Sequence, residues 1–200
     1  MAVPEEATDE ALASRAALGD NHAFDEITLR YQARVYRLAC RLVGLDDAPD
    51  VVQESFLSVY RHLGSFRHQS RFSTWLYRIV TNTALMNRRA RARRPVDSLD
   101  AYLPDFDADG THCRMPAELQ IAAHVDELLD RRFLAEQAAA ALERLPDLYR
   151  TAFVLRDLEE LTTAEVADVL GVESAAVRQR VHRARLMLRG YLNNLARASR

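Results

Sequence analysis

The sequence predicts an all-α protein in which two small helical domains are joined by a flexible acidic linker. Apolar residues recur at steps of three and four along most of the 200-residue chain, which is the period of a helix with one buried face. Glycine and proline are sparse, with six of each, and no stretch of useful length alternates as a half-buried strand does. The charge distribution predicts the division into domains.

The formal net charge of −2 combines three unequal segments. Residues 1–94 contain 14 arginines and 11 acids, residues 95–130 one arginine and nine acids, and residues 131–200 12 arginines and nine acids. There is no lysine. Prolines and aspartates in the middle segment indicate an exposed linker. The predicted units are a tail at 1–9, a helical domain at 10–94, the linker at 95–130, a second helical domain at 131–193 and a tail at 194–200.

Three long helices are expected in the first domain. One covers residues 23–43 and a second roughly residues 49–63, each with apolar residues on one face. The third is expected to begin after an N-cap at Ser73 and to end before Pro95. Residues 64–72 between the last two are polar, basic and too irregular for a helix.

Aromatic and basic residues alternate through the irregular segment and into the following helix: Phe66, Phe72, Trp75 and Tyr77 with Arg61, Arg67, Arg71 and Arg78. Arginines bind phosphates, and aromatic rings beside them can stack on unpaired bases. On the third helix Arg78, Asn82 and Arg89 share a face. The alternative interpretation assigns Phe72 and Trp75 to the hydrophobic core, and counting residues does not separate the two.

In the second domain, helical pattern resumes near Leu119, is interrupted at Pro146 and continues as a short helix over residues 147–158. Thr162 and Glu165 have the spacing of a capping box, and Gly171 suits the tight stop of that helix. A final helix is expected over residues 174–192.

These features predict a helix-turn-helix whose second helix enters the major groove. An α-helical hairpin with a solvated charged face is the alternative. The exposed face of the final helix carries Arg178, Gln179, Arg180, His182, Arg183, Arg185 and Arg189. Arginine and glutamine can each make two hydrogen bonds to a base edge, so Arg178, Gln179 and Arg183 are candidate base readers. His182 either contacts DNA or is an ordinary surface residue.

Other classes of protein find little support. No stretch reaches the roughly 18 apolar residues of a membrane span, no secretory signal is visible, and two cysteines fall short of a disulfide framework, so we expect a cytoplasmic protein. Residues 105–110 begin like a calcium loop, but its twelfth position is Pro116. No set of acid, base and nucleophile suggests a reaction. We expect neither an enzyme nor a cofactor or metal.

Two groups of motifs resemble the extracytoplasmic-function sigma factors. Two segments resemble region 2 of that family: DVVQESF at 50–56, followed by Tyr60 and Arg61, and FSTWLYRIVTN at 72–82. Residues 145–157, the helix-turn-helix and VHRAR at 181–185 are similar to region 4. Both occur in the order of the family and together cover most of residues 20–192. Met86 departs from the pattern, standing where aspartate is frequent.

The resemblance implies a promoter-recognition subunit of bacterial RNA polymerase. It places Asp50, Gln53 and Glu54 on the helix that docks on the largest polymerase subunit. It places Phe66–Phe72 on a loop that captures a flipped base of the minus-ten element, and Asn82 on the helix that opens this element. The helix that reads the minus-thirty-five duplex would carry Arg178, Gln179, His182 and Arg183. It also implies core RNA polymerase, promoter DNA and an anti-sigma factor as partners. The alternative is a free-standing helix-turn-helix regulator that acts without polymerase.

Overall fold

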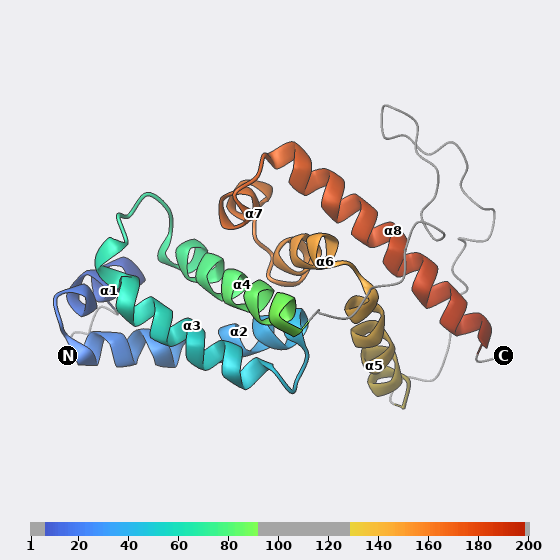
Figure 1. Ribbon diagram of the computed structural model, residues 1–200, viewed down its shortest axis with the longest axis horizontal. Coiled ribbons are helices and arrows are strands. Elements are labelled where there is room, and N and C mark those ends of the chain that lie inside the picture. The colour runs from blue at the N-terminus through green and yellow to red at the C-terminus, as the bar shows by residue number, and fades with distance from the viewer. Residues whose placement is uncertain (1–6, 92–128, 199–200) are drawn as a thin grey trace, which may run out of the picture.

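The computed structural model describes residues 7–91 and 129–198, with side chains at 7–91 and 137–192, and every regular element in these ranges is helical (Figure 1). The all-α prediction is therefore confirmed. Most of the predicted linker, including Pro95, the segment 105–110 and the expected helix start at Leu119, lies outside the described residues. No helix in the described part combines the length and the hydropathy needed to cross a membrane.

The described elements form two units separated along the chain. The first unit contains α1 (Asp9–Ala17), α2 (Asn21–Val43), α3 (Ala48–His62), η1 (Leu63–Ser65) and α4 (Phe72–Arg91). The second unit contains α5 (Leu129–Arg144), α6 (Asp147–Phe153), η3 (Val154–Leu158), α7 (Thr163–Leu170) and α8 (Ser174–Ala198). The helices expected at 23–43, 49–63 and 174–192 are all present. The short helix at 147–158 is present too, but its second half, η3, is a wider π-helical turn.

The first unit is built around α2, which contacts α1, α3 and α4. Ile27, Val35 and Leu38 on its inner face are fully buried. Helix α1, which the sequence pattern did not predict, is fastened to α2 by polar bonds: the Tyr31 hydroxyl donates to Asp9 Oδ2 at 2.5 Å, and Arg30 Nη1 donates to Asp9 Oδ1 at 3.0 Å. Part of the predicted tail thus belongs to the folded unit.

The predicted N-cap at Ser73 is wrong, because α4 already begins at Phe72 and Ser73 lies inside the helix. The first helical hydrogen bond runs from the Trp75 amide to the Arg71 carbonyl, at 3.2 Å. The Phe72 amide, which has no partner within the helix, donates to Glu10 Oε1 of α1 at 3.2 Å. A carboxylate 62 residues away therefore does what the local serine was expected to do.

The helix-turn-helix has the local geometry that its sequence predicts. The Glu165 amide donates to Thr162 Oγ1 at 3.2 Å, and the Thr162 amide donates to Glu165 Oε2 at 2.9 Å, so the capping box is complete. Gly171 ends α7 in the left-handed conformation, with φ 63° and ψ 41°. Val166 and Val177 are fully buried where α7 meets α8.

The capping box predicts a dependence of stability on pH. Hydrogen bonds from Thr162 lower the pKa of Glu165 in the folded chain. Its contribution to stability is therefore present above the unfolded pKa of about 4.3 and is lost as the pH falls through the lower, folded value. We expect Glu165→Gln to reduce the free energy of unfolding at pH about 7, and this difference to shrink below pH about 4. Urea unfolding at both pH values measures it; a difference independent of pH would contradict the prediction.

The two units pack against one another through α2 and α4 of the first and α5, α6, η3 and α7 of the second (Figure 1). Arg150 lies in this junction, with 1% of its surface exposed. Its guanidinium donates to the carbonyls of Leu145 at 2.9 Å, of Leu42 in the first unit at 3.2 Å, and of Glu143. Burial lowers the pKa of Arg150 to about 10, so the group remains a cation at neutral pH.

Ion pairs complete the junction, and each joins an arginine of the first unit to a carboxylate of the second. Arg41 Nη1 lies 2.5 Å from Glu159 Oε1, and Arg88 Nε lies 2.5 Å from Asp147 Oδ1. Burial raises the pKa of Glu159, and the Arg41 guanidinium acts in the opposite direction. In these ion pairs the first unit supplies the cation and the second unit the carboxylate.

Candidate functional site

The loop between η1 and α4, residues 66–71, is called the aromatic loop below. Phe66 is half-buried, and its ring centroid lies 5.7 Å from that of Phe72 and 5.4 Å from that of Trp75. Phe72 is fully buried and Trp75 is 7% exposed. The core interpretation is therefore right for both, and Phe72 leaves the set of candidate base contacts because its ring packs on Tyr31, Phe66 and Trp75.

A polar hollow of about 230 Å³ lies beside the aromatic loop and is lined by Gln69, Ser70, Thr74, Trp75, Arg78 and Asp168. Arg78 is exposed on α4, and Asn82, also exposed, follows one turn later on the same face. The hollow thus brings Arg78 together with polar loop residues that the sequence did not single out, while Asn82 is not part of its lining. Helical spacing places Thr74 on that face as well, and this signal could have identified it.

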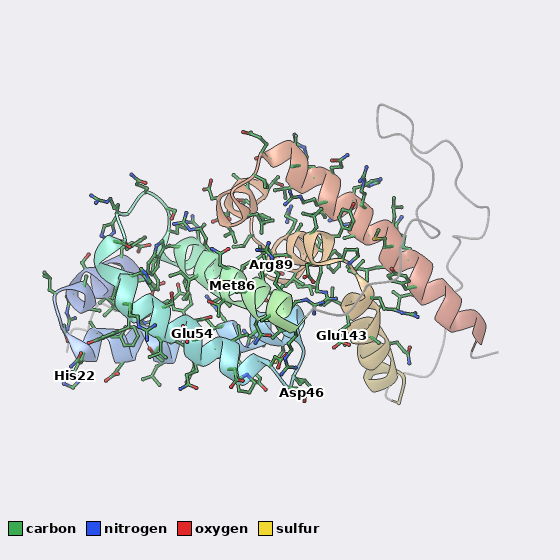
Figure 2. The ribbon with its side chains drawn as sticks, in the orientation of Figure 1. His22, Asp46, Glu54, Met86, Arg89 and Glu143 are labelled. Atoms are coloured by element: carbon green, nitrogen blue, oxygen red, sulfur yellow. The ribbon has the colours of Figure 1, made fainter. Side chains whose placement is uncertain are left out.

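A second hollow, the α3–α4 groove, has a volume of about 740 Å³. It is lined by Asp50, Val51, Gln53, Glu54, Leu57 and Ser58 of α3 and by Thr83, Met86, Asn87 and Ala90 of α4. All three residues that the resemblance assigns to polymerase docking lie together along it. Met86 is 69% exposed and Leu57 42% exposed, so the groove has apolar points beside its carboxylates (Figure 2).

The arginine face of α8 borders a third hollow, called the α8 hollow below, with a volume of about 240 Å³. It is lined by Arg156, Thr163, Val177, Arg178, Val181, His182 and Arg185. Arg178, Gln179 and His182 are exposed, as predicted. Arg156 comes from η3 and was missed, because no periodicity links it to α8. The hollow combines positive charge with the N-terminus of α7, an arrangement suited to the DNA backbone.

Not all arginines of α8 are equally available to DNA. Arg183 is half-buried, and its Nη1 donates to the Tyr149 hydroxyl of α6 at 3.2 Å. Arg185 donates twice to the Asp157 carboxylate of η3, both at 2.8 Å, and this pairing raises the pKa of Arg185. Arg183, the third candidate base reader, is thus hydrogen-bonded to another helix of the protein. The sequence predicted instead that all these arginines lie on one exposed face.

Comparisons with known proteins agree with these features. The family model "Sigma-70 region 2" matches residues 27–94, and "Sigma-70, region 4" matches residues 135–188. The "ECF RNA polymerase sigma-E factor" of Haemophilus influenzae is 38% identical over 193 residues, covering 96% of this chain and 98% of that protein. The protein of the same name from Escherichia coli strain K12 is 38% identical over 185 residues, covering 90% and 92%.

Among solved structures, that of CnrH in complex with the cytosolic domain of CnrY is similar, with a TM-score of 0.65 and 26% identity. The match covers 93% of this chain and 97% of CnrH. Because both helical units match one family in order, a free-standing helix-turn-helix regulator is not favoured. The chain belongs to the extracytoplasmic-function sigma factors of the sigma-70 family, the non-enzymatic subunits with which RNA polymerase recognises promoters and initiates transcription.

Proposed function

We propose that this sigma factor reads a two-part promoter with two separate surfaces and docks on core RNA polymerase with a third. The observation that supports this most is that the hollow beside the aromatic loop, the α8 hollow and the α3–α4 groove combine the chemistry each task needs. The work would take place in the cytoplasm, where polymerase and promoter DNA are found. We also propose an anti-sigma factor as partner, since CnrH was solved with a bound protein domain.

Minus-ten DNA is proposed to bind at the hollow beside the aromatic loop. Arg78 would contact the phosphate backbone, and Asn82 would hydrogen bond to an exposed base. Phe66, which is half-buried and packs on Trp75, would offer the aromatic surface on which a flipped base can stack. Phe72 would support the loop from the core without touching DNA.

The minus-thirty-five duplex is proposed to bind α8. Arg178 and Gln179 are exposed side chains capable of paired hydrogen bonds to base edges, and they would supply sequence specificity. His182 and Arg156 flank the same hollow and would contact phosphates. Arg183 would contact the phosphate backbone of the DNA and so position the duplex, because its guanidinium is also bonded to Tyr149.

Core polymerase is proposed to occupy the α3–α4 groove. Asp50, Gln53 and Glu54 would pair with basic and polar groups of the partner. The exposed thioether of Met86 is an apolar anchor of the kind that contributes strongly at interface centres. We therefore assign Met86, which replaces a frequent aspartate of the family, to polymerase docking and not to the minus-ten contact.

Transcription in vitro tests the function as a whole. The purified chain is combined with core RNA polymerase and a fragment library of the source genome, and the transcript starts are mapped. Starts that share a two-part motif and require the chain are expected. No complex with core and no new transcript, with DNA binding intact, would instead support the regulator that acts alone.

We expect Arg178→Ala to weaken binding of the upstream duplex found in that assay by about 1–3 kcal/mol, and to relax specificity at one position. Arg183→Ala should weaken binding to all duplexes by similar factors, since a phosphate contact carries no sequence information. Fluorescence anisotropy against the mapped duplex and its single-base variants separates the two patterns. The assignment fails if Arg183→Ala is the selective variant.

Met86→Ala should weaken binding to core polymerase by about five- to thirtyfold, because a buried methionine contributes about 1.5–3 kcal/mol and alanine retains part of it. Met86→Leu keeps the apolar volume and is the matched control, expected to bind nearly as the wild type. Binding of single-stranded DNA should be unchanged in both. If Met86→Ala loses binding of single-stranded DNA but still binds core polymerase, Met86 belongs to the minus-ten surface.

A further inference from the structure

Helix α7 of the second unit lies against α4 of the first, beside the aromatic loop (Figure 1). Asp168 of α7 lines the same hollow as Gln69, Trp75 and Arg78. Glu165, one turn earlier, has Oε1 at 3.7 Å from Arg71 Nη1 of the loop. Two carboxylates of the second unit thus lie where the proposed function brings the phosphates of minus-ten DNA.

The negative charge beside the loop and α4 comes from the second unit. The sequence has no aspartate or glutamate between Glu54 and Asp97, so the loop and α4 contain no carboxylate of their own. Glu10 of α1 reaches this region, but its carboxylate is engaged by the Phe72 amide. In the described residues, Glu165 thus faces Arg71 of the loop, and Asp168 lies with Arg78 of α4 around the hollow.

The junction that holds α7 in this place is extensive. Arg41 pairs with Glu159 and Arg88 with Asp147, and the buried Arg150 donates to the Leu42 carbonyl. Each of these contacts crosses between the units, and none of these residues lines the hollow. Minus-ten DNA and α7 would place negative charge at the same arginines, so α7 in this position would weaken the binding of that DNA.

We propose that the acidic face of α7 is an internal competitor of minus-ten DNA, which occupies the hollow until the two units separate. The inference rests on the proposed function, because it takes the hollow as the site of that DNA. The α8 hollow is lined by second-unit residues alone, so the upstream-reading surface stays open in the same arrangement. The chain by itself would hence bind the upstream duplex but hold single-stranded DNA weakly.

The first test measures binding of the full chain, without polymerase, to a fluorescent single strand of mixed sequence about 12 nucleotides long. Asp168→Asn should bind it about three- to fivefold more tightly than the wild type, the size expected for one exposed charge contact. Glu173→Gln removes the same charge from an exposed position of the second unit outside the hollow, and should change binding by less than about twofold. Equal effects of the two variants would overturn the inference.

A second variant separates the units. Asp147→Asn with Glu159→Gln removes two of the ion pairs that cross the junction, and circular dichroism verifies that its helices are retained. A larger radius of gyration by small-angle scattering, together with binding at least as tight as that of Asp168→Asn, is expected. A larger radius with no gain in binding would contradict the competition.

A third variant distinguishes this inference from the function on which it rests. Arg78→Ala, introduced with Asp168→Asn, should abolish the gain in single-strand binding. If single-strand binding requires Arg78 but Asp168→Asn equals Glu173→Gln, only the internal competition is wrong. If binding is absent, or does not depend on Arg78, the hollow is not the minus-ten site, and both proposals fail.

Discussion

Replacing Phe72 by alanine is expected to lower the free energy of unfolding by about 3–5 kcal/mol. The ring is fully buried and lies 5.6 Å from Tyr31 of α2 and 5.8 Å from Trp75 of α4, measured between ring centroids. Its removal leaves a cavity at the point where α4 and the aromatic loop join the core, and the neighbouring rings can only partly refill it. Thermal unfolding followed by circular dichroism should show a decrease in Tm well above about 10 °C.

Two matched variants separate the core role of Phe72 from a contact with DNA. Phe72→Leu keeps most of the apolar volume and should lose less than about 1.5 kcal/mol while binding DNA as the wild type does. Phe66→Ala removes a half-buried ring, so its effect on stability should be smaller and its effect on minus-ten binding larger. A stable Phe72→Leu protein that no longer opens promoters would show that the ring contacts a base.

Replacing Arg150 by methionine is expected to lower the free energy of unfolding by about 3 kcal/mol. Methionine has a similar length, so the apolar packing is largely preserved, but it cannot donate to the carbonyls of Glu143, Leu145 and Leu42. Leu42 keeps a donor in Arg88, at 3.3 Å, whereas the other two carbonyls lose their guanidinium partner at the end of α5. A buried acceptor without a partner costs about 1–3 kcal/mol.

Urea unfolding of the full chain measures the effect of Arg150→Met. Arg37, an exposed arginine of α2, provides the control, since Arg37→Met should change stability by no more than about 0.5 kcal/mol. Arg150→Lys retains the charge but not the fork of donors, and we expect an intermediate loss. A stability of Arg150→Met equal to that of the wild type would mean that burying the cation offsets its hydrogen bonds.

Much of the candidate site could be predicted because its signals lie within a few residues of one another. Arg78 and Asn82 share a face through the helical period alone, and Asp50, Gln53 and Glu54 line one groove for the same reason. The capping box, the turn glycine and the arginine-rich face of residues 178–189 together predicted a DNA-binding helix-turn-helix in the second domain. The role of each arginine was not predictable, because the hydrogen bond that engages Arg183 comes from a tyrosine of another helix.

The sequence by itself determined the helical class, the long helix α2, and the turn from α7 to α8. Each follows from hydrogen bonds or side-chain spacings within about four residues, as in the capping box of Thr162 and the left-handed Gly171. Both regions of the sigma-70 family were also recognisable from short motifs in the correct order. Such local interactions can be predicted from neighbouring residues alone, because no residue distant in the chain takes part in them.

Only the tertiary structure decided which groups are buried and which partners they meet. Phe72 and Trp75 have the same sequence signal as Phe66, yet contacts with a ring 41 positions earlier place Phe72 in the core. The cap of α4 comes from Glu10, and the charges beside the aromatic loop come from α7. These contacts join residues far apart in the chain, and burial depends on how complete units pack, so no local pattern contains them.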